Sequence, residues 1–208
     1  MAKLYFRYGA MNSGKSSALL QAAFNYEERG HRVLLAKPAI DTKGDRSISS
    51  RLGLTREVDL LFGHGDPVRD LIREACAAGE EPVSCVLVDE AQFLEPRQID
   101  DLLRVAVLDM IPVMAYGIRT DFQTVAFPGS QRLLEIAHSI EELKTICRCG
   151  RKAIFNARLV DGGFVFDGAQ VAIDHVGEVT YESVCGACYL AASGGRLAAD
   201  LEAAGPGA

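Results

Sequence analysis

The segment GAMNSGKS, residues 9–16, places glycine, lysine and serine at the spacing G-x-x-x-x-G-K-[ST]. It lies between a β-rich run and a run with helical spacing, which is where phosphate-binding loops of this type occur. The glycines let the backbone curl so that successive N–H groups point at a phosphate, and the helix adds its positive end. Lys15 is expected to bridge the β- and γ-phosphates, and the Ser16 hydroxyl to hold Mg²⁺.

This pattern predicts a nucleoside triphosphate site rather than a chance glycine-rich turn. The predicted phosphate contacts are Gly9, Ala10, Met11, Asn12, Ser13, Gly14, Lys15 and Ser16.

Two acids, Asp89 and Glu90, directly follow the apolar run CVLV at residues 85–88. An acid at the carboxyl end of a buried parallel strand faces the ligand crevice of an open α/β sheet. Asp89 is therefore expected to help bind Mg²⁺, directly or through water. Glu90 is left to act on an acceptor hydroxyl or on a water. A surface acidic turn is the alternative interpretation.

Four of the six cysteines form two close pairs, Cys147 with Cys149 and Cys185 with Cys188. In a reducing compartment such pairs are more typical of metal ligands than of disulfides. Four thiolates complete a closed tetrahedral zinc site, which is structural because no coordination position stays open. A redox pair or unpaired core cysteines are the alternatives. The other two, Cys76 and Cys85, are expected to be buried core thiols.

Alternation of strand and helix patterns predicts a doubly wound α/β sheet. Strands are expected at residues 3–8, 33–36, 86–88 and 112–116, helices at 15–29, 67–78, 96–110 and 131–140, and loops at 41–53 and 119–129. The predicted fold is a P-loop NTPase-type, mostly parallel sheet with helices on both faces, plus a small C-terminal zinc-binding domain. The expected boundaries are 1–145 for the first domain, 146–193 for the second and 194–208 for a disordered tail.

Composition limits the classes of partner. The chain has 208 residues and a formal net charge of −6, which argues against general binding to nucleic acid or anionic membranes. No run approaches the ~18–20 apolar residues of a membrane-spanning helix. The N-terminus has no apolar segment followed by a cleavage site. We therefore expect a cytoplasmic protein that binds neither nucleic acid nor membrane.

Taken together, several ordered segments resemble the thymidine kinase family of cellular type (type II), whose members are zinc-containing tetrameric enzymes. The matching segments are the phosphate loop with Met11, VDEAQF at 88–93, YGIRTDF at 116–122, LKTIC at 143–147 and YESVC at 181–185. The resemblance spans residues 3–189. It departs at Asp174-His175, where the family has a glycine pair, and in extra residues before Tyr181.

The resemblance implies roles for individual residues. Glu90 would be the base that takes the proton of the 5′-hydroxyl, and Asp89, Glu90, Ala91 and Gln92 would border the ATP site. The segment between the cysteine pairs would be the family's lasso, which closes over the nucleoside. The implied substrate contacts are Met11, Phe122, Asn156, Val171, Ala172, Ile173 and Tyr181. The aromatic side chains Phe93 and Phe127 are further candidates for packing on the base, with a place in the core as the alternative. Asp41 and Arg51 lie where the family has a flexible loop near the phosphates.

The implied reaction is the Mg²⁺-dependent transfer of the γ-phosphate of ATP to the 5′-hydroxyl of thymidine, or of deoxyuridine, in the salvage of DNA precursors. The resemblance further implies structural Zn²⁺, a homotetramer and feedback inhibition by thymidine triphosphate. From the residues alone, two rivals stay open: a P-loop NTPase that hydrolyses its nucleotide, and a zinc-ribbon adaptor for nucleic acid. The N-K-x-D motif of a GTPase does not occur, and the acidic balance opposes the adaptor.

Overall fold

The computed structural model describes residues 1–39, 46–168, 170 and 179–203. The chain forms two compact units. The large unit comprises Met1–Tyr8, Gly14–Ile118 and Pro128–Leu143, and the small unit comprises Gly9–Ser13, Arg119–Phe127 and the chain from Lys144 onward. Across these described ranges, no helix has the length and apolar character needed to cross a membrane.

The large unit is built on a six-stranded sheet in which every neighbouring pair of strands is parallel. The strand order is β5 (Leu60–Phe62), β2 (Arg32–Pro38), β6 (Val83–Val88), β7 (Val113–Gly117), β1 (Leu4–Tyr8) and β8 (Ser139–Glu142). Since the strands are parallel, their carboxyl ends share one edge of the sheet. Only β7 separates β1 from β6 at that edge.

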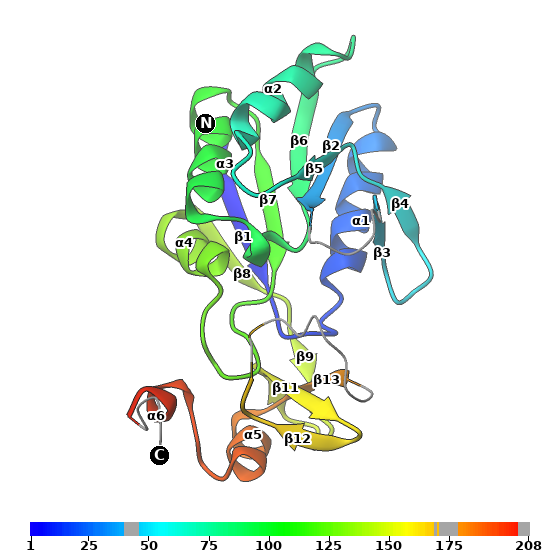
Figure 1. Cartoon of the computed structure of the whole chain (residues 1–208). Coiled ribbons are helices and arrows are strands. Elements are labelled where there is room, and N and C mark those ends of the chain that lie inside the picture. Colours follow the sequence, from blue (N-terminus) through cyan, green and yellow to red (C-terminus); the bar gives the residue numbers. More distant parts are fainter. Residues whose placement is uncertain (40–45, 169, 171–178, 204–208) are drawn as a thin grey trace. The chain divides into compact units, whose positions relative to one another are not determined.

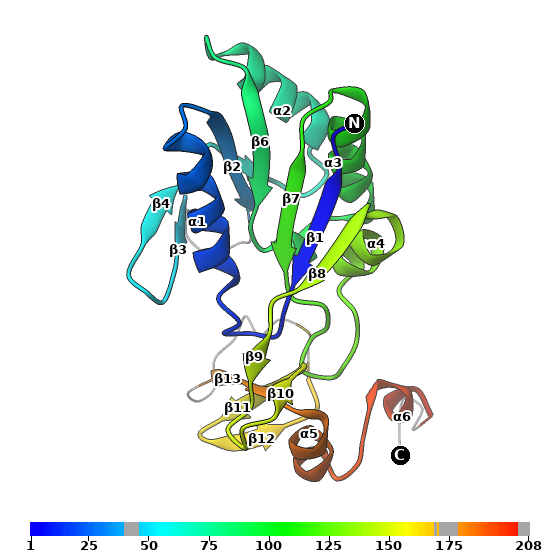
Figure 2. The same ribbon diagram turned by 180° about the vertical axis from the view of Figure 1, so that it is seen from behind.

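Helices cover both faces of this sheet (Figures 1 and 2). One face carries α1 (Lys15–Glu27), and the other carries α2 (Val68–Ala77), α3 (Pro96–Leu108) and α4 (Pro128–Ile136). Along β2, Val33 and Leu35 pack with α1, while Leu34 and Ala36 pack with the other helices. The part of a strand that is buried on both faces has to be apolar, as residues 33–36 of β2 are. The predicted parallel α/β sheet with helices on both faces is confirmed.

Two strands of the sheet, β5 and β8, were not predicted from the sequence. The predicted helix over residues 131–140 is wrong at its C-terminal end, because α4 stops at Ile136 and Ser139–Glu142 pairs with β1 instead. The sequence of β8, SIEE, lacks an apolar strand pattern because an edge strand tolerates polar side chains. The helix also begins earlier than expected, at Pro128, since proline fits the first helical turn.

A third difference lies in the predicted loop at residues 41–53. Part of it is strand β3 (Ser47–Ser49), which forms an antiparallel hairpin with β4 (Thr55–Glu57). Arg56 of this hairpin donates to both carboxylate oxygens of Glu27 on α1. Arg51 is exposed between the two strands, and Asp41 lies outside the described residues.

The main sheet of the small unit has three antiparallel strands in the order β12 (Gly163–Val165), β11 (Phe155–Val160) and β13 (Val179–Val184). A second strand pair, β9 (Thr145–Ile146) with β10 (Lys152–Ala153), brackets the first cysteine pair, and α5 (Gly186–Ser193) follows Cys185. The core of the unit surrounds the buried ring of Tyr189, which contacts the rings of Phe155, Phe164 and Phe166. The expected tail contains a helix, α6 (Ala198–Ala203), and residues 204–208 lie outside the described residues.

A single 3-10 turn, η1 (Ala91–Phe93), follows β6 and packs against the start of α4. At Gly129 of α4, a Cβ atom would lie 2.6 Å from the carbonyl oxygen of Leu94 and 2.7 Å from that of Ala91. Backbone oxygens cannot give way as a flexible side chain does. A residue without a side chain is therefore required here, and α4 thereby fixes the turn that follows the two acids.

Candidate active site

A hydrogen bond joins the end of β6 to the first turn of α1. The Ser16 hydroxyl donates to Asp89 Oδ2 at 2.9 Å, and the N–H of Glu90 donates to the other carboxylate oxygen at 3.0 Å. Asp89 is 4% exposed. A hydroxyl and a carboxylate are hard oxygen donors of the kind that Mg²⁺ prefers. The two residues predicted to hold Mg²⁺ are therefore brought together, and their donor set fits that ion.

Lys15 lies beside this pair and is itself buried. Burial lowers the pKa of its ammonium group, opposed by the charges of Glu90 and Asp89. Burial likewise raises the pKa of Asp89 to about 6, and the Glu90 carboxylate adds to that rise, while Ser16 and Lys15 oppose it. Buried ionisable groups are stable in their charged forms only when other charges or hydrogen bonds replace water. This cluster therefore favours a ligand that carries both negative charge and a bound cation.

Glu90 is held in an uncommon backbone conformation. Its φ of 50° is in the left-handed region, which residues other than glycine seldom adopt outside turns. The Gln92 amide nitrogen donates to a carboxylate oxygen of Glu90, and the Gln92 amide oxygen accepts from the N–H of Ile118 at 3.2 Å. A Cβ at Gly117 would lie 2.6 Å from that amide oxygen. Gln92 is 1% exposed. Because both ends of its amide have partners, its side chain holds the Glu90 carboxylate in place.

The phosphate-loop motif lies between β1 and α1, as its pattern requires. Gly14 precedes α1 with a φ of 78°, a conformation that suits glycine, and Asn12 has a φ of 64°. The Ser13 hydroxyl is buried and has no hydrogen-bond partner among the described residues. An unpaired buried hydroxyl is costly, and a phosphate oxygen at the loop would supply its acceptor.

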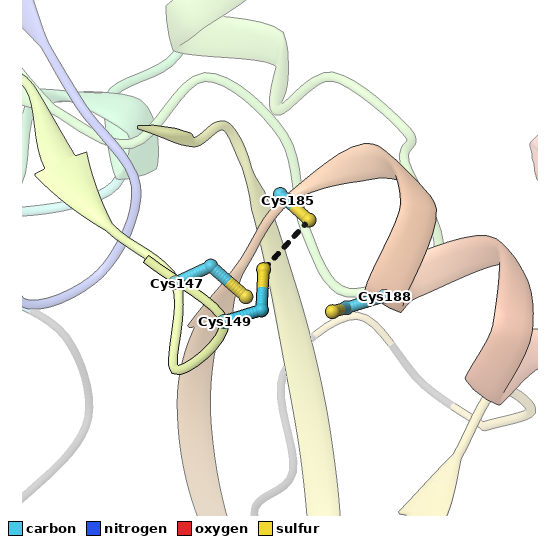
Figure 3. Close-up of side chains that lie close together, drawn as sticks. All are labelled: Cys147, Cys149, Cys185 and Cys188. Atoms are coloured by element: carbon cyan, nitrogen blue, oxygen red, sulfur yellow. Dashed lines mark hydrogen bonds between the residues drawn. The ribbon is translucent and has the colours of Figure 1, made fainter. Parts of the chain in front are cut away.

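The four paired cysteines converge in the small unit (Figure 3). Their sulfur atoms all lie within 4.8 Å of one another, and the Sγ atoms of Cys149 and Cys185 are 3.5 Å apart. Four sulfurs at about 2.3 Å from one zinc ion would be about 3.8 Å apart in a tetrahedron. Backbone hydrogen bonds lower the pKa of the Cys147 and Cys185 thiols, which favours the thiolates that bind metal, whereas hydrogen bonds to the neighbouring thiols raise the pKa of Cys188. The donor set and its spacing fit zinc.

The other two cysteines, Cys76 and Cys85, lie in or against the hydrophobic core. Cys85 is fully buried on β6, and burial raises the pKa of its thiol to about 12. Cys76 is partly buried and packs against the core of the large unit.

The predicted substrate residues divide between the units. Phe122, Asn156 and Tyr181 belong to the small unit, where Phe122 is 1% exposed and Asn156 is 3% exposed. Phe93 is half-buried in the large unit. Val171, Ala172 and Ile173 lie outside the described residues.

Two further residues contact this group, and the sequence indicated no role for either, although Ser183 lies in the matching segment YESVC. The guanidinium carbon of Arg158 lies 3.6 Å from the centre of the Phe122 ring, and the Ser183 hydroxyl donates to the carbonyl oxygen of Met11. Both residues are buried polar side chains. Each of them lies on the same strand as a predicted substrate residue, Arg158 with Asn156 and Ser183 with Tyr181. This signal can be used only once the register of the two strands is known.

The chain is similar to known proteins over most of its length. The profile of a family described as "Thymidine kinase" matches residues 2–189. A "Thymidine kinase" of Ruegeria pomeroyi (strain ATCC 700808 / DSM 15171 / DSS-3) is 49% identical over 187 residues, which covers 89% of this chain and 92% of that protein. A "Thymidine kinase" of Rhizobium meliloti (strain 1021) is also 49% identical over 187 residues, covering 89% and 94%. One from Legionella pneumophila (strain Paris) is 46% identical over 198 residues, covering 94% and 93%.

Among solved structures, a chain titled "Crystal structure of DNA replication initiation factor" is similar over 68% of this chain and 40% of its own length. The TM-score is 0.37 at 15% sequence identity. A likeness this weak carries no argument about fold or function.

Proposed function

The chain belongs to the thymidine kinase family, and on that premise we propose that it transfers the γ-phosphate of ATP, with Mg²⁺, to the 5′-hydroxyl of thymidine or deoxyuridine. The products are dTMP and ADP, and the role is salvage of DNA precursors. The observation that carries the proposal is a group at the carboxyl edge of the parallel sheet, in which the buried side chains of Lys15 and Asp89 lie with the partly buried hydroxyl of Ser16. Ligands of open α/β sheets bind at that edge.

Phosphoryl transfer needs in-line positioning and neutralisation of phosphate charge more than it needs covalent chemistry. Lys15 and the loop N–H groups would hold the phosphates of ATP. Ser16 and Asp89 would hold the Mg²⁺, which supplies charge neutralisation when bound. Because Lys15 and Asp89 are buried, their interactions with the phosphates are screened little by water.

Glu90 is suited to act as the general base for the acceptor hydroxyl. It follows Asp89 in the chain, and Gln92 fixes its carboxylate through a hydrogen bond. A base must be held within hydrogen-bond reach of the proton that it abstracts. A carboxylate that is tied to the backbone of Ile118 through Gln92 meets the need for a fixed position.

The acceptor would be bound by residues of the small unit, with Phe122 and Tyr181 packing on the thymine base and Met11 near it. Asn156, which the sequence suggested as a contact of the base, lies beside these residues with both ends of its amide bonded to backbone. Phe93 of the large unit is a further proposed contact, and residues 171–173 are proposed contacts outside the described residues. The four clustered cysteines would hold a structural zinc ion. From the sequence we further propose domain boundaries at 1–145 and 146–193 and a location in the cytoplasm. A homotetramer and feedback inhibition by thymidine triphosphate, which the family resemblance implies, are also proposed.

The proposed acceptor is tested with γ-labelled ATP, Mg²⁺ and a panel of deoxynucleosides. Thymidine should have the highest kcat/KM, and deoxyuridine, which lacks only a methyl group, should fall within ~10–200-fold of it. Deoxycytidine presents a donor where thymine presents an acceptor, and such mismatches discriminate by ~10⁴–10⁵. Comparable values for deoxycytidine and thymidine would refute the proposed specificity. Release of inorganic phosphate without transfer would indicate a hydrolase.

A second prediction concerns the base. Glu90→Gln keeps the shape of the side chain but cannot accept the hydroxyl proton, so kcat should fall by ~10²–10⁴-fold while the KM for thymidine changes little. The matched control is Glu95→Gln. Glu95 is a half-buried acid that caps α3, so its substitution should lower stability and leave kcat unchanged. If Glu90→Gln raises only the KM, Glu90 binds substrate and is not the base.

A third prediction concerns the cysteine cluster. Freshly purified protein should contain about one zinc ion per chain by elemental analysis, since four thiolates complete one closed site. Cys149→Ser should lose most of that zinc, because a hydroxyl is a poor zinc ligand. Cys76→Ser, at a thiol outside the cluster, should retain it. Zinc content that is unaffected by Cys149→Ser would contradict the assignment.

A further inference from the structure

Strands β11 and β13 present two consecutive cross-strand pairs on one face. Asn156 lies opposite Ser183, and Arg158 lies opposite Tyr181. Residues two apart on a strand point to the same face, and directly opposed residues of two strands share that face. Between them, Ala157 points the other way, into the core of the small unit. The polar face of this strand pair is therefore set apart from the face that packs the core.

The first pair holds one residue of the phosphate loop. The Asn156 amide oxygen accepts from the N–H of Met11 at 2.7 Å, and the Ser183 hydroxyl donates to the carbonyl oxygen of the same residue. Asn156 and Ser183 are both buried. Both backbone polar groups of Met11 are thus bonded to this strand pair, and buried bonds of this kind are costly to break.

Asn156 reaches a second loop with the other end of its amide. Its nitrogen donates to the carbonyl oxygen of Thr120 at 2.8 Å. Thr120 stands two residues before Phe122, in the loop that joins β7 to α4. One buried side chain therefore connects Met11 to Thr120 through two short hydrogen bonds. The amide has only these two ends, and each is bonded to a different loop.

The second pair holds that loop at Phe122. The planar guanidinium of Arg158 stacks on the Phe122 ring, with 3.6 Å between the guanidinium carbon and the ring centre, and its Nε donates to the Tyr181 hydroxyl at 3.1 Å. Stacking of this type is typical of arginine and is worth most when both groups are buried, as here. The Tyr189 hydroxyl donates to the Phe122 carbonyl oxygen at 2.6 Å. Arg158 therefore holds the ring of Phe122, and Tyr189 holds its backbone.

We propose that this strand pair aligns the phosphate loop with the loop between β7 and α4, which carries Phe122. Asn156 is the positioning residue that joins the two loops. The inference rests on the proposed function, in which Met11 belongs to the ATP loop and Phe122 to the thymidine pocket. Transfer requires the reacting atoms to be about 3–3.5 Å apart and in line, and a displacement of about 1 Å can cost ~10²-fold in rate. Two hydrogen bonds from one amide fix the two loops relative to each other on that scale.

A positioning role differs in its kinetics from a substrate contact. Each loop still binds its own ligand when the connection is cut, so the KM values of ATP and thymidine should change little. What is lost is the alignment of the two ligands, which appears in kcat. A thymidine contact at Asn156 would instead raise the KM for thymidine, because binding energy to the ground state would be removed.

The test is steady-state kinetics of Asn156→Ala with ATP and thymidine, after the wild-type protein has been shown to phosphorylate thymidine. We expect kcat to fall ~10²-fold with both KM values within a few fold. Ser183→Ala removes a single bond to Met11 and should give a smaller loss of kcat, again with little change in either KM. It also serves as the test if Asn156→Ala does not fold.

The matched control is Gln98→Ala. Gln98 is another buried amide bonded at both ends to backbone, to the N–H of Glu95 and the carbonyl oxygen of Gly63, and it touches neither loop. The Gln98→Ala variant should be less stable than the wild-type protein and have the same kcat.

The alignment role is overturned if kcat is unchanged in folded Asn156→Ala or Ser183→Ala, or if only the KM for thymidine rises. A wild-type protein that does not phosphorylate thymidine would instead refute the proposed function.

Discussion

The hydrogen bond between Ser16 and Asp89 joins the two segments on which the rest of the site depends. It connects the first turn of the helix after the phosphate loop to the end of β6. Lys15 is buried beside it, so a cation and a carboxylate are withheld from water together. Such a group is stable only if charges are matched locally. The parallel sheet brings these groups together, because the carboxyl ends of its strands meet at one edge.

The backbone around the two acids is shaped to hold them. Glu90 takes a left-handed conformation, Gln92 ties its carboxylate to Ile118, and Gly117 leaves room for the Gln92 amide. Gly129 brings α4 against the same turn. These constraints position the carboxylate that we propose abstracts the proton of the acceptor hydroxyl. In the small unit, Asn156 and Arg158 hold Met11 and Phe122 in the same manner, by committing buried polar groups to fixed partners.

The sequence predicted those features that depend on residues close together in the chain. The phosphate-loop motif, the apolar strand ending at Asp89 and the two cysteine pairs are local patterns, and the strands at residues 3–8 and 33–36 are apolar enough to identify. Strands β5 and β8 were missed because three apolar residues, or a half-acidic edge segment, carry no strand signal without a neighbour to pair with. Arg158 and Ser183 were missed because their roles follow from the pairing of β11 with β13. No local pattern encodes that register.

The most direct measurement is calorimetric titration of ATP into the wild-type protein and into Asp89→Asn, each with Mg²⁺ and with EDTA. If Asp89 and Ser16 hold the ion that accompanies the phosphates, the wild-type protein should bind ATP much more tightly with Mg²⁺ than without it. Asp89→Asn should lose most of that difference, because the carboxamide lacks the charge that binds the cation. An Asp89→Asn variant with the full Mg²⁺ dependence of the wild-type protein would contradict this account of the site.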